Sequence, residues 1–478
     1  MGVATLSACL KRAGHQIELI HISNKIDKNQ FIRRIRESNP SLIAFSFISN
    51  MWPQVKELTR WAKELNIPMI HGGLHPTIMP QEVINCEGVS ILCIGEGEGA
   101  IIDLCDNMQK GLSIDGISNL WIKKTSGEII KNPVRPLIEN LDDLPFLDYG
   151  IFDYPRLEDV KIMKQLAVMA SRGCPYQCTY CCNHLLKTLY PNSEHYVRFK
   201  SVGRLMEDIK HGLCKYPFLE IVWFTDDTLS LDKEWFLEFA DRYSREINLP
   251  YICHARANQI DPQIADAFKK SRCRHIGLGI ESGDEYIRNT IMKRNLSDQQ
   301  ILTAYHILKD RGIETTAFNI LGAPSETMGT LLETVKLNAK ADPNKLTNAY
   351  FYPYKGTVLF DICKEKGYRI KQDALSFFER PILQLNTVSE EQIIFAYNYF
   401  SALTRLYKKY LGFSESLSKK LTAKTDELLC RPNFPYQLFN RIYGVFDYFK
   451  RAIMFYAGKC PPIYKTLRFL WHKIMGLF

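Results

Sequence analysis

Short apolar runs alternate with segments of helical periodicity along most of the chain, and this alternation restricts the fold more than any other feature. In the first 110 residues, the apolar runs at 17–23, 41–49, 67–73 and 90–97 predict buried parallel strands, with helical segments between them. This order is typical of a doubly wound α/β domain, which binds ligands at the carboxyl ends of its strands. We therefore expect a Rossmann-like domain over residues 1–131.

A second alternating series follows residues 132–163, a stretch rich in Pro and Asp that predicts a linker. Its strands are expected near 166–173, 221–227, 251–257, 275–282, 315–322 and 346–354. Six βα units predict a partial (β/α)6 TIM-like barrel over residues 164–385, with its chemistry at the carboxyl ends of the strands. Residues 386–478 are helical in pattern, basic and aromatic, which predicts a helical C-terminal domain.

Four of the 14 cysteines crowd into "CPYQCTYCC", directly after the first strand of the second series. No charged n-region and apolar h-region precede the first domain, so we expect a reducing, cytoplasmic location, where clustered cysteines hold metal more often than they form disulfides. A structural zinc site needs four ligands, and no second Cys-x2-Cys follows. Three thiolates, from Cys174, Cys178 and Cys181, can instead hold three irons of a [4Fe-4S] cubane and leave the fourth open. Cys182 follows Cys181 directly, so its side chain is expected to point elsewhere.

The cysteine spacing, with an aromatic residue before the last cysteine, is similar to that of the radical S-adenosylmethionine superfamily. The resemblance covers most of residues 165–370 and includes "FTDDT", "GIESGDE", "ILGAPSET" and "PYKGT". It implies a cluster on the three cysteines and S-adenosylmethionine bound near Tyr180, Asp226, Asp227, Arg256, Glu281, Ser282 and Gly322. Three alternatives remain for these residues: loop capping for the aspartates, helix capping for Glu281 and a structural salt bridge for Arg256. No general acid or base is assigned.

The first domain carries "GGLHPT" and "GEGEG" at two predicted strand ends and, with the linker "NLDDLPFLDYG", resembles the cobalamin-binding branch of that superfamily. Because Asp-x-His-x-x-Gly is absent, the resemblance implies cobalamin bound without a protein histidine below the metal. The residues expected to face it are Ser46, Ser49, Gly72, Gly73, Gly95 and Glu96. For the glycines, the alternative is a role in the turns alone.

Members of this branch begin with a strand that lies centrally in the sheet, whereas Met1 here directly precedes the first predicted helix. A missing central strand exposes apolar edges and unpaired backbone groups. Either translation starts upstream, or the corrinoid site is compromised.

The resemblance implies reductive cleavage of S-adenosylmethionine, hydrogen abstraction from an unactivated carbon of a small-molecule or lipid substrate, and methyl transfer through methylcobalamin. An external electron donor such as flavodoxin or ferredoxin is expected. One alternative is a cobalamin-linked oxidative cyclase or rearrangement enzyme. A non-catalytic alternative is an iron–sulfur or corrinoid-binding carrier.

The positive charge of the chain is concentrated near its C-terminal end. Residues 401–478 contain 14 Lys and Arg against four acidic residues, a balance of +10 in a chain whose net charge is +9. Aromatic and aliphatic residues recur there at helical spacing. This pattern predicts either a helical cap over the barrel mouth or a peripheral contact with a lipid or an anionic membrane. No nucleic-acid-binding motif accompanies the charge, so nucleic acid is not expected as a partner.

Overall fold

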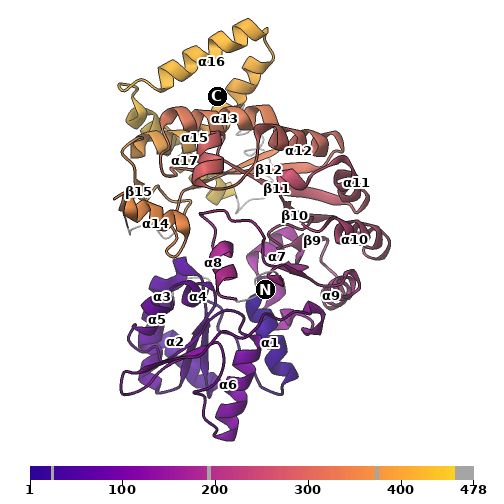
Figure 1. Ribbon diagram of the computed structural model, residues 1–478, viewed down its shortest axis with the longest axis vertical. Coiled ribbons are helices and arrows are strands. Elements are labelled where there is room, and N and C mark those ends of the chain that lie inside the picture. Colours follow the sequence, from indigo (N-terminus) through magenta and orange to yellow (C-terminus); the bar gives the residue numbers. More distant parts are fainter. Residues whose placement is uncertain (23–25, 191–194, 372–375, 458–478) are drawn as a thin grey trace. The chain divides into compact units, whose positions relative to one another are not determined.

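The computed structural model describes residues 1–22, 26–190, 195–371 and 376–457 (Figure 1). It divides into two compact units. The first unit comprises residues 1–278, 307–315 and 353–362, and the second comprises residues 279–306, 316–352 and 363–478.

The first unit opens with a five-stranded sheet in the order β1-β2-β3-β4-β5. Its strands are β1 (Ile43–Ser46), β2 (Met69–Gly72), β3 (Ile91–Cys93), β4 (Leu120–Lys123) and β5 (Ile129–Lys131). The first three are parallel, and β4 and β5 continue the sheet as an antiparallel hairpin. The sequence analysis missed this hairpin, although two short apolar runs around a Ser-Gly turn are its ordinary signal.

Helices cover both faces of this sheet. They are α1 (Gly2–Arg12), α2 (Lys28–Ser38), α3 (Trp52–Ala62), α4 (Leu74–Ile78), α5 (Pro80–Ile84) and α6 (Glu98–Lys110), with the 3-10 turns η1 (Ser49–Met51) and η2 (Lys63–Leu65). The apolar residues of α1 and α6 form one core cluster with the strands, and those of α2 and α3 form another (Figure 1). Local signals define the helix ends: Asp27 caps α2, and Gly111 ends α6 with a φ of 66°.

The strand predicted at 17–23 is wrong: residues 17–22 form no strand, and residue 23 lies outside the described residues. In flavodoxin-like sheets, of order 2-1-3-4-5, the second strand pairs only with the first. None of the described strands pairs with residues 17–22. Among the described strands β1 pairs with β2 alone, and its Ala44 and Ser46 are exposed.

The segment predicted as a linker consists of short helical turns that connect α1 with the second sheet. Its elements are η3 (Leu141–Asp143), η4 (Tyr149–Ile151), η5 (Tyr154–Arg156) and α7 (Glu158–Met163). Asp148 accepts hydrogen bonds from Ser7 and Lys11 of α1, both 2.7 Å long. The hydroxyl of Tyr149 donates to the carbonyl of Ala167 at 2.6 Å. These contacts hold the segment against both neighbours.

The second sheet has six strands in the order β13-β12-β11-β10-β9-β6, which confirms all six predicted strands. They are β6 (Gln165–Val168), β9 (Ile221–Phe224), β10 (Tyr251–Ala255), β11 (Cys273–Glu281), β12 (Glu314–Leu321) and β13 (Lys345–Tyr350). The intervening helices are α8 (Asn183–Thr188), α9 (Val202–Lys215), α10 (Lys233–Glu246), α11 (Pro262–Lys270), α12 (Asp298–Asp310), α13 (Met328–Ala341) and α14 (Val358–Glu365). Short elements complete this region: β7 (Ser171–Arg172), β8 (Arg198–Phe199), η7 (Ala257–Gln259), the π-helical turn η8 (Tyr286–Ile291), β14 (Arg369–Ile370) and β15 (Leu383–Gln384). In the first unit α9, α10 and α11 lie side by side along the outside of the sheet (Figure 1).

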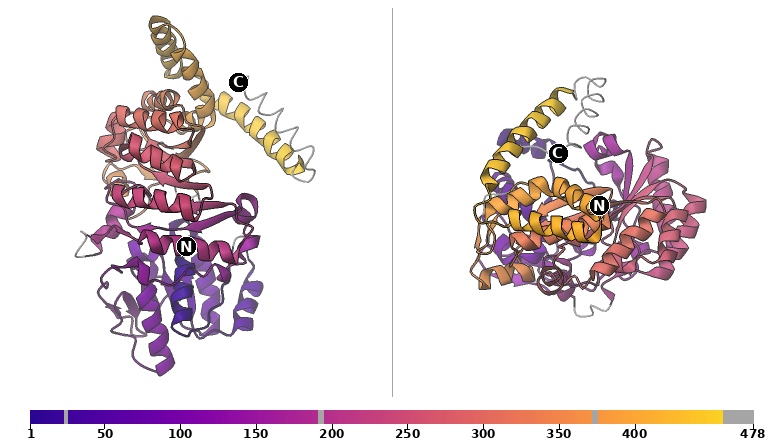
Figure 2. Two further views of the ribbon diagram at one scale, coloured as in Figure 1. Left: turned by 90° about the vertical axis from the view of Figure 1, so that its right-hand side faces the viewer. Right: turned by 90° about the horizontal axis from the view of Figure 1, so that it is seen from above.

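Three helices follow in the second unit, as the sequence predicts: α15 (Glu390–Leu411), α16 (Glu415–Leu429) and α17 (Tyr436–Ala457). Ser389 and Gln392 form a capping box that begins α15, which packs against α13, α16 and α17. Figure 2 shows α17, in yellow, extending away from the end of α15. None of the described helices is both long and apolar enough to cross a membrane.

Candidate functional site

A buried carboxylate holds the chain just before the cysteine loop. Asp226, which follows β9, is 2% exposed and accepts hydrogen bonds from the backbone N–H of Ala170 at 3.1 Å and from the N–H and hydroxyl of Ser171 at 2.5 Å. Burial raises the pKa of Asp226 to about 6, against the opposing effect of these donors. These contacts are those of a loop-capping residue, which is the alternative role that the sequence left open for Asp226. Asp227 is exposed and accepts a 2.9 Å hydrogen bond from Asn183.

The three predicted cluster cysteines lie on one tight loop between β7 and α8. The N–H of Cys181 donates to the carbonyl of Cys178 at 3.1 Å, and the side-chain amide of Asn183 lies 3.6 Å from the Cys181 sulfur. Burial raises the pKa of Cys174 to about 11, and the neighbouring charges of Cys181 and Cys178 add to this rise. All three cysteines are free of disulfides.

Cys182 directly precedes α8, which begins at Asn183. The neighbouring thiol of Cys182 lowers the pKa of Cys181 to about 7, and Cys181 raises the pKa of Cys182. Cys181 is thereby biased toward the thiolate, the form that binds metal. The expectation that Cys182 points away from the cluster stays a prediction.

This donor set fits a [4Fe-4S] cluster. Within the described residues, no three His, Cys, Asp or Glu side chains are arranged to hold a single metal ion. A cubane makes a different demand, because each thiolate binds a separate iron at a separate corner. Three reduced thiols on one loop, with Arg256 donating to Cys178 and Asn183 to Cys181, meet that demand.

The carboxyl end of β11, in the second unit, forms a constrained turn at Glu281 and Ser282. Glu281 has a φ of 63°, a conformation that L-residues other than Asn and Asp rarely adopt, and its carboxylate lies 3.5 Å from the guanidinium of Arg294. Ser282 is fully buried, and its carbonyl accepts a 2.9 Å hydrogen bond from Arg288. The helix-capping alternative belongs to Asp284, which caps the following turn at Ile287. Backbone strain of this kind concentrates at ligand sites.

Gly322, at the end of β12, is shaped by a buried acid that the sequence analysis missed. Gly322 has a φ of 86°, and a Cβ there would meet the side chain of Ile393 at 3.3 Å. The N–H groups of Gly322 and Ala323 donate to one oxygen of Glu326 at 2.5 and 2.9 Å. Glu326 is fully buried, and this burial raises its pKa to about 8.

A protonated Glu326 makes stability depend on pH. Because its folded pKa of about 8 lies above the ordinary value of 4.5, the folded state binds the extra proton between these pH values. The stability contributed by this group is complete below about pH 4 and falls as the pH rises toward 8. The free energy of unfolding of the neutral variant Glu326→Gln should therefore rise relative to that of the wild type by about 3–5 kcal/mol as the pH increases from 5 to 8. Urea unfolding of both proteins across this range tests it, and a constant difference would show that Glu326 is ionised throughout.

In the first domain, several residues expected to face a corrinoid have partners within the domain. A Cβ on Gly73, whose φ is 99°, would lie 2.7 Å from the carbonyl oxygen of Phe47, so the glycine permits close packing of β2 against that segment. The hydroxyl of Ser49 pairs with Nδ1 of His75 at 3.1 Å. Ser46 is exposed at the end of β1, and Gly72 has only ordinary contacts around its missing Cβ.

Gly95 and Glu96, after β3, contact the segment around the cysteine loop. A Cβ on Gly95 would lie 2.5 Å from the hydroxyl of Tyr190, which accepts a hydrogen bond from the N–H of Glu96. The Glu96 carboxylate accepts from Arg172 at 2.9 Å and from Arg198 at 2.8 and 3.1 Å. Burial opposes ionisation of Glu96, but the two guanidinium groups together lower its pKa. The sequence analysis missed Arg172, Arg198 and Tyr190, since no local signal marks them.

The edge formed by the ends of β1, β2 and β3 fits a corrinoid. His75 is 3% exposed, and among the described residues its Nε2 has no hydrogen-bond partner. Burial lowers the pKa of His75 to about 4, so the ring is neutral. An unpaired buried nitrogen at this edge is a group that a bound ligand rich in amides can satisfy. These residues would hold cobalamin, which the sequence analysis expected at this edge.

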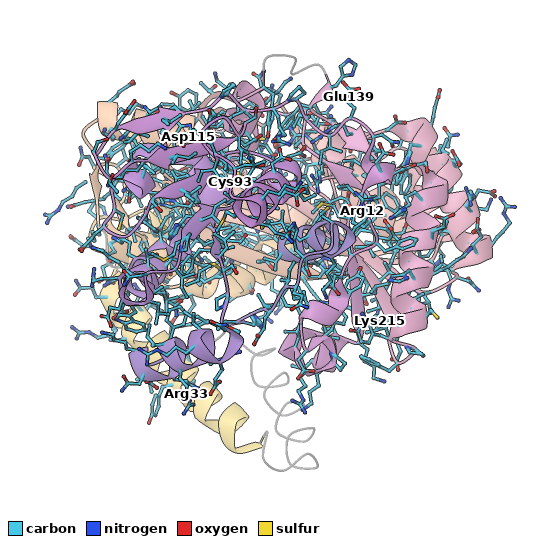
Figure 3. All side chains as sticks on the ribbon, turned by 90° about the horizontal axis from the view of Figure 1, so that it is seen from below. Arg12, Arg33, Cys93, Asp115, Glu139 and Lys215 are labelled. Carbon is cyan, nitrogen blue, oxygen red and sulfur yellow. The ribbon has the colours of Figure 1, made fainter. Side chains whose placement is uncertain are left out.

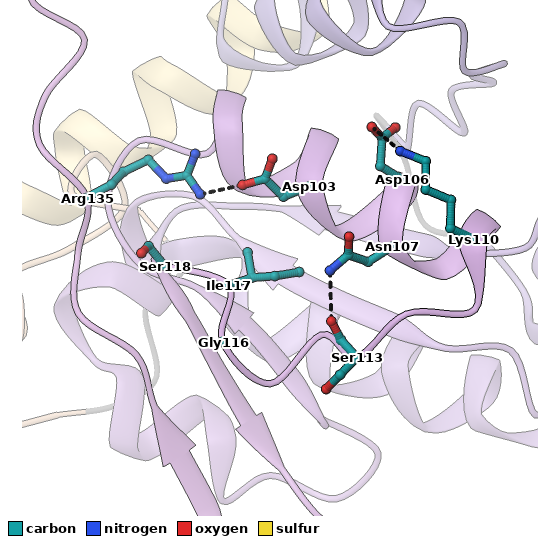
Figure 4. Close-up of a pocket in the computed structure, with 9 residues that line it drawn as sticks. All are labelled: Asp103, Asp106, Asn107, Lys110, Ser113, Gly116, Ile117, Ser118 and Arg135. Atoms are coloured by element: carbon teal, nitrogen blue, oxygen red, sulfur yellow. Dashed lines mark hydrogen bonds and ion pairs between the residues drawn. The ribbon is translucent and has the colours of Figure 1, made fainter.

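A polar hollow lies elsewhere on the same domain, between the second half of α6 and the loop that leads into β4 (Figure 4). Asp103 pairs there with Arg135 at 2.8 Å, and Asn107 donates to the carbonyl of Ser113 at 2.7 Å. Because α6 starts beside β3's carboxyl end, its second half lies at the opposite end of the domain. Figure 3 labels Asp115 of this loop and the buried Cys93 of β3. Arg135 of this hollow donates to Asn119, whose amide donates to the carbonyl of Glu96 at 3.3 Å, so the hollow is linked to the loop after β3.

Comparison with known proteins agrees with this arrangement. A model of the radical SAM superfamily matches residues 168–337, and a model of the B12 binding domain matches residues 1–104. The chain is 26% identical over 399 residues to an uncharacterized methyltransferase of Pyrococcus horikoshii, covering 82% of this chain and 84% of that protein. It is 24% identical to the anaerobic magnesium-protoporphyrin IX monomethyl ester cyclase of Rubrivivax gelatinosus (76% and 66%) and 26% identical to the hopanoid C-3 methylase of Methylococcus capsulatus (68% and 61%).

Solved structures show the same fold at low sequence identity. The methyltransferase TsrM from Kitasatospora setae, with cobalamin and a [4Fe-4S] cluster bound, superposes with a TM-score of 0.62 at 16% identity, covering 76% of this chain and 72% of that one. The cobalamin-dependent radical enzyme OxsB, with aqua-cobalamin bound, gives a TM-score of 0.66 at 15% identity, covering 95% and 72%. The chain therefore carries a B12 binding domain ahead of a radical SAM domain, and the cofactors of these two domains are cobalamin, a [4Fe-4S] cluster and S-adenosylmethionine.

Proposed function

We propose that this protein is a cobalamin-dependent radical SAM C-methyltransferase that acts on an unactivated carbon of a small molecule. The observation that carries the proposal is the network of Glu96 with Arg172 and Arg198. Through it, one compact unit joins the loop after β3, at the corrinoid edge, to the strand that leads into the cysteine loop. Two of the three relatives compared by sequence are named as methyl-transferring enzymes, which supports the same reading.

When bound, the cluster supplies an electron that cleaves S-adenosylmethionine, and cobalamin carries a methyl group to the substrate. In this proposal, Cys174, Cys178 and Cys181 hold the cluster, and Asp226 fixes the backbone that precedes them. Asp227, exposed beside Asn183, is available to accept from the methionine ammonium group.

We assign three further side chains to the proposed cofactor site. Glu281 and Ser282 contact the nucleoside, and Tyr180 lies beside the last cluster cysteine. The reductant is an external carrier such as flavodoxin or ferredoxin.

Two products of S-adenosylmethionine separate methyl transfer from the oxidative alternative. Loss of the methyl group leaves S-adenosylhomocysteine, whereas reductive cleavage leaves 5′-deoxyadenosine and methionine. We expect reconstituted protein with cobalamin and titanium(III) citrate to form both products, and S-adenosylhomocysteine to disappear when cobalamin is omitted. Cys178→Ala should lose 5′-deoxyadenosine. Formation of 5′-deoxyadenosine without S-adenosylhomocysteine would instead favour a cyclase, the class to which the Rubrivivax gelatinosus relative belongs.

We further propose that the C-terminal helices contact an anionic membrane and that the substrate is a lipid. One face of α17 packs on α15, where the rings of Phe439 and Tyr443 contact Tyr399. On another face, Leu438, Ile442 and Val445 form an i, i+4, i+7 stripe and are 56%, 41% and 57% exposed. Arg441 is exposed on α17 next to this stripe, and Lys419, Lys420 and Lys424 are exposed on α16. An apolar stripe with nearby cations is typical of helices that lie in a membrane interface.

Liposome cosedimentation tests the membrane proposal. Protein should sediment with vesicles of phosphatidylcholine and phosphatidylglycerol at low salt, and less at high salt because salt screens the cations. The double variant Ile442→Glu/Val445→Glu should reduce binding at least about tenfold, since two carboxylates oppose both insertion and the surface charge. Leu112→Glu, at an exposed leucine of the first domain, is the matched control. Equal binding of both variants would assign the stripe to another partner.

A further inference from the structure

In the first unit, the cluster loop contacts the segment after β10. The proposed function assigns no role to this contact. Arg256 directly follows β10 and is 5% exposed. Its guanidinium carbon lies 3.8 Å from the ring centroid of Tyr176, within the range of a cation–π interaction. Tyr176 belongs to the cysteine loop, midway between Cys174 and Cys178.

Two neighbouring amides hold the same tyrosine from its other end. The side-chain amide of Asn258 donates to the Tyr176 hydroxyl at 3.3 Å, and that of Gln259 donates at 3.1 Å. Both residues belong to η7, the turn that follows Arg256. Arg256 thus contacts the ring of Tyr176 and the turn after it contacts the hydroxyl, so the tip of the cluster loop is fixed relative to β10.

The position of Arg256 also determines where its N–H groups point. Stacking on Tyr176 directs Nη1 to the sulfur of Cys178 at 3.8 Å, within hydrogen-bond range for sulfur. Cys178 is 7% exposed, so water competes little for that sulfur. Hydrogen bonds to ligand sulfurs and exclusion of solvent are two of the factors that set the reduction potential of an iron–sulfur cluster.

We propose that Arg256 is a positioning residue for the cluster: held by Tyr176, it donates to the Cys178 thiolate and raises the reduction potential of the cluster. The added electron makes the cluster more negative, and a nearby cation with an N–H donor stabilises that form more than the oxidised form. This role differs from both expectations for Arg256, which were binding of S-adenosylmethionine and a structural salt bridge. The proposal rests on the cluster alone and does not depend on whether the enzyme methylates or cyclises its substrate.

A redox titration of the cluster without S-adenosylmethionine tests this role independently of turnover. Arg256→Met, which keeps the length of the side chain but removes the donors and the charge, should assemble the cluster and lower its equilibrium constant for reduction about tenfold. For one electron this is a fall of about 59 mV in midpoint potential, read from the electron paramagnetic resonance signal. Arg256→Lys, which keeps the charge but loses the planar fork, should give a smaller fall and serves if the Met variant does not fold.

Two controls separate this role from others. Arg311→Met removes an arginine that pairs with Asp266 at an exposed site of the first unit, and it should leave the potential unchanged. Tyr176→Leu, which removes the stacking partner, should shift the potential in the same direction as Arg256→Met and release iron faster to a chelator. An unchanged potential in Arg256→Met, with a weakened spectral response to S-adenosylmethionine, would overturn the proposal and return Arg256 to a role in binding that ligand. If the wild type formed no S-adenosylhomocysteine while the potential effect was intact, only the proposed function would be contradicted.

Discussion

Replacement of Cys174, Cys178 or Cys181 by alanine is expected to abolish the [4Fe-4S] cluster, whereas Cys182→Ala should retain it. Each of the three thiolates binds its own iron corner, and the fourth corner must stay open for S-adenosylmethionine, so the loop has no ligand to spare. Cluster content is measured as iron and sulfide per chain after anaerobic reconstitution. The electron paramagnetic resonance spectrum of the reduced wild type should change on addition of S-adenosylmethionine.

The adjacency of Cys181 and Cys182 makes one further variant necessary. Cys182 is the neighbouring thiol, so a control must show that it does not replace Cys181 as a ligand when Cys181 is removed. The double variant Cys181→Ala/Cys182→Ala separates the two cases. If Cys181→Ala kept its iron and the double variant lost it, Cys182 would be an alternative ligand, and the assignment of Cys181 as the sole third ligand would be wrong.

Glu96→Ala should strongly destabilise the first unit. Among the described residues, the Glu96 carboxylate is the only acidic partner of Arg198, whose side chain is 7% exposed. Removing it leaves a buried guanidinium without a counter-charge, which costs about 3 kcal/mol or more. Arg172 keeps Glu98 at 2.6 Å, so the loss falls mainly on Arg198. Urea unfolding followed by the fluorescence of the intact protein measures the change.

Two control variants make the Glu96 result interpretable. Glu87→Ala removes an equally charged residue of the same domain whose partner Lys63 is exposed, and it should leave the free energy of unfolding nearly unchanged. Glu96→Gln keeps an acceptor for the N–H of Ile138, so its free energy of unfolding should lie between those of Glu96→Ala and Glu87→Ala. Equal stability of the Glu96→Ala and Glu87→Ala proteins would mean that the arginine network does not hold the cysteine segment to the first domain.

The chemical classes of the two cofactor sites could be predicted from short stretches of sequence. Cys174, Cys178 and Cys181 lie within eight consecutive residues, so their shared loop follows from chain connectivity. The glycine-rich strand ends of the first domain were similarly recognisable. The contacts of their individual residues were not, because Gly73 serves the packing of Phe47 and Glu96 serves two arginines.

The sequence by itself determined which segments are buried strands and helices, because burial on one or both faces leaves a periodicity within each segment. It predicted all six strands of the second sheet and the helical C-terminal region. Tertiary structure decided which segments find partners. The apolar run at 17–23 has the composition of a strand, yet residues 17–22 form none, since a strand needs a neighbour as well as a suitable composition. Likewise, Glu96 meets Arg172 and Arg198 across 76 and 102 residues of chain, and no local pattern encodes a contact that only the folded arrangement of the loops creates.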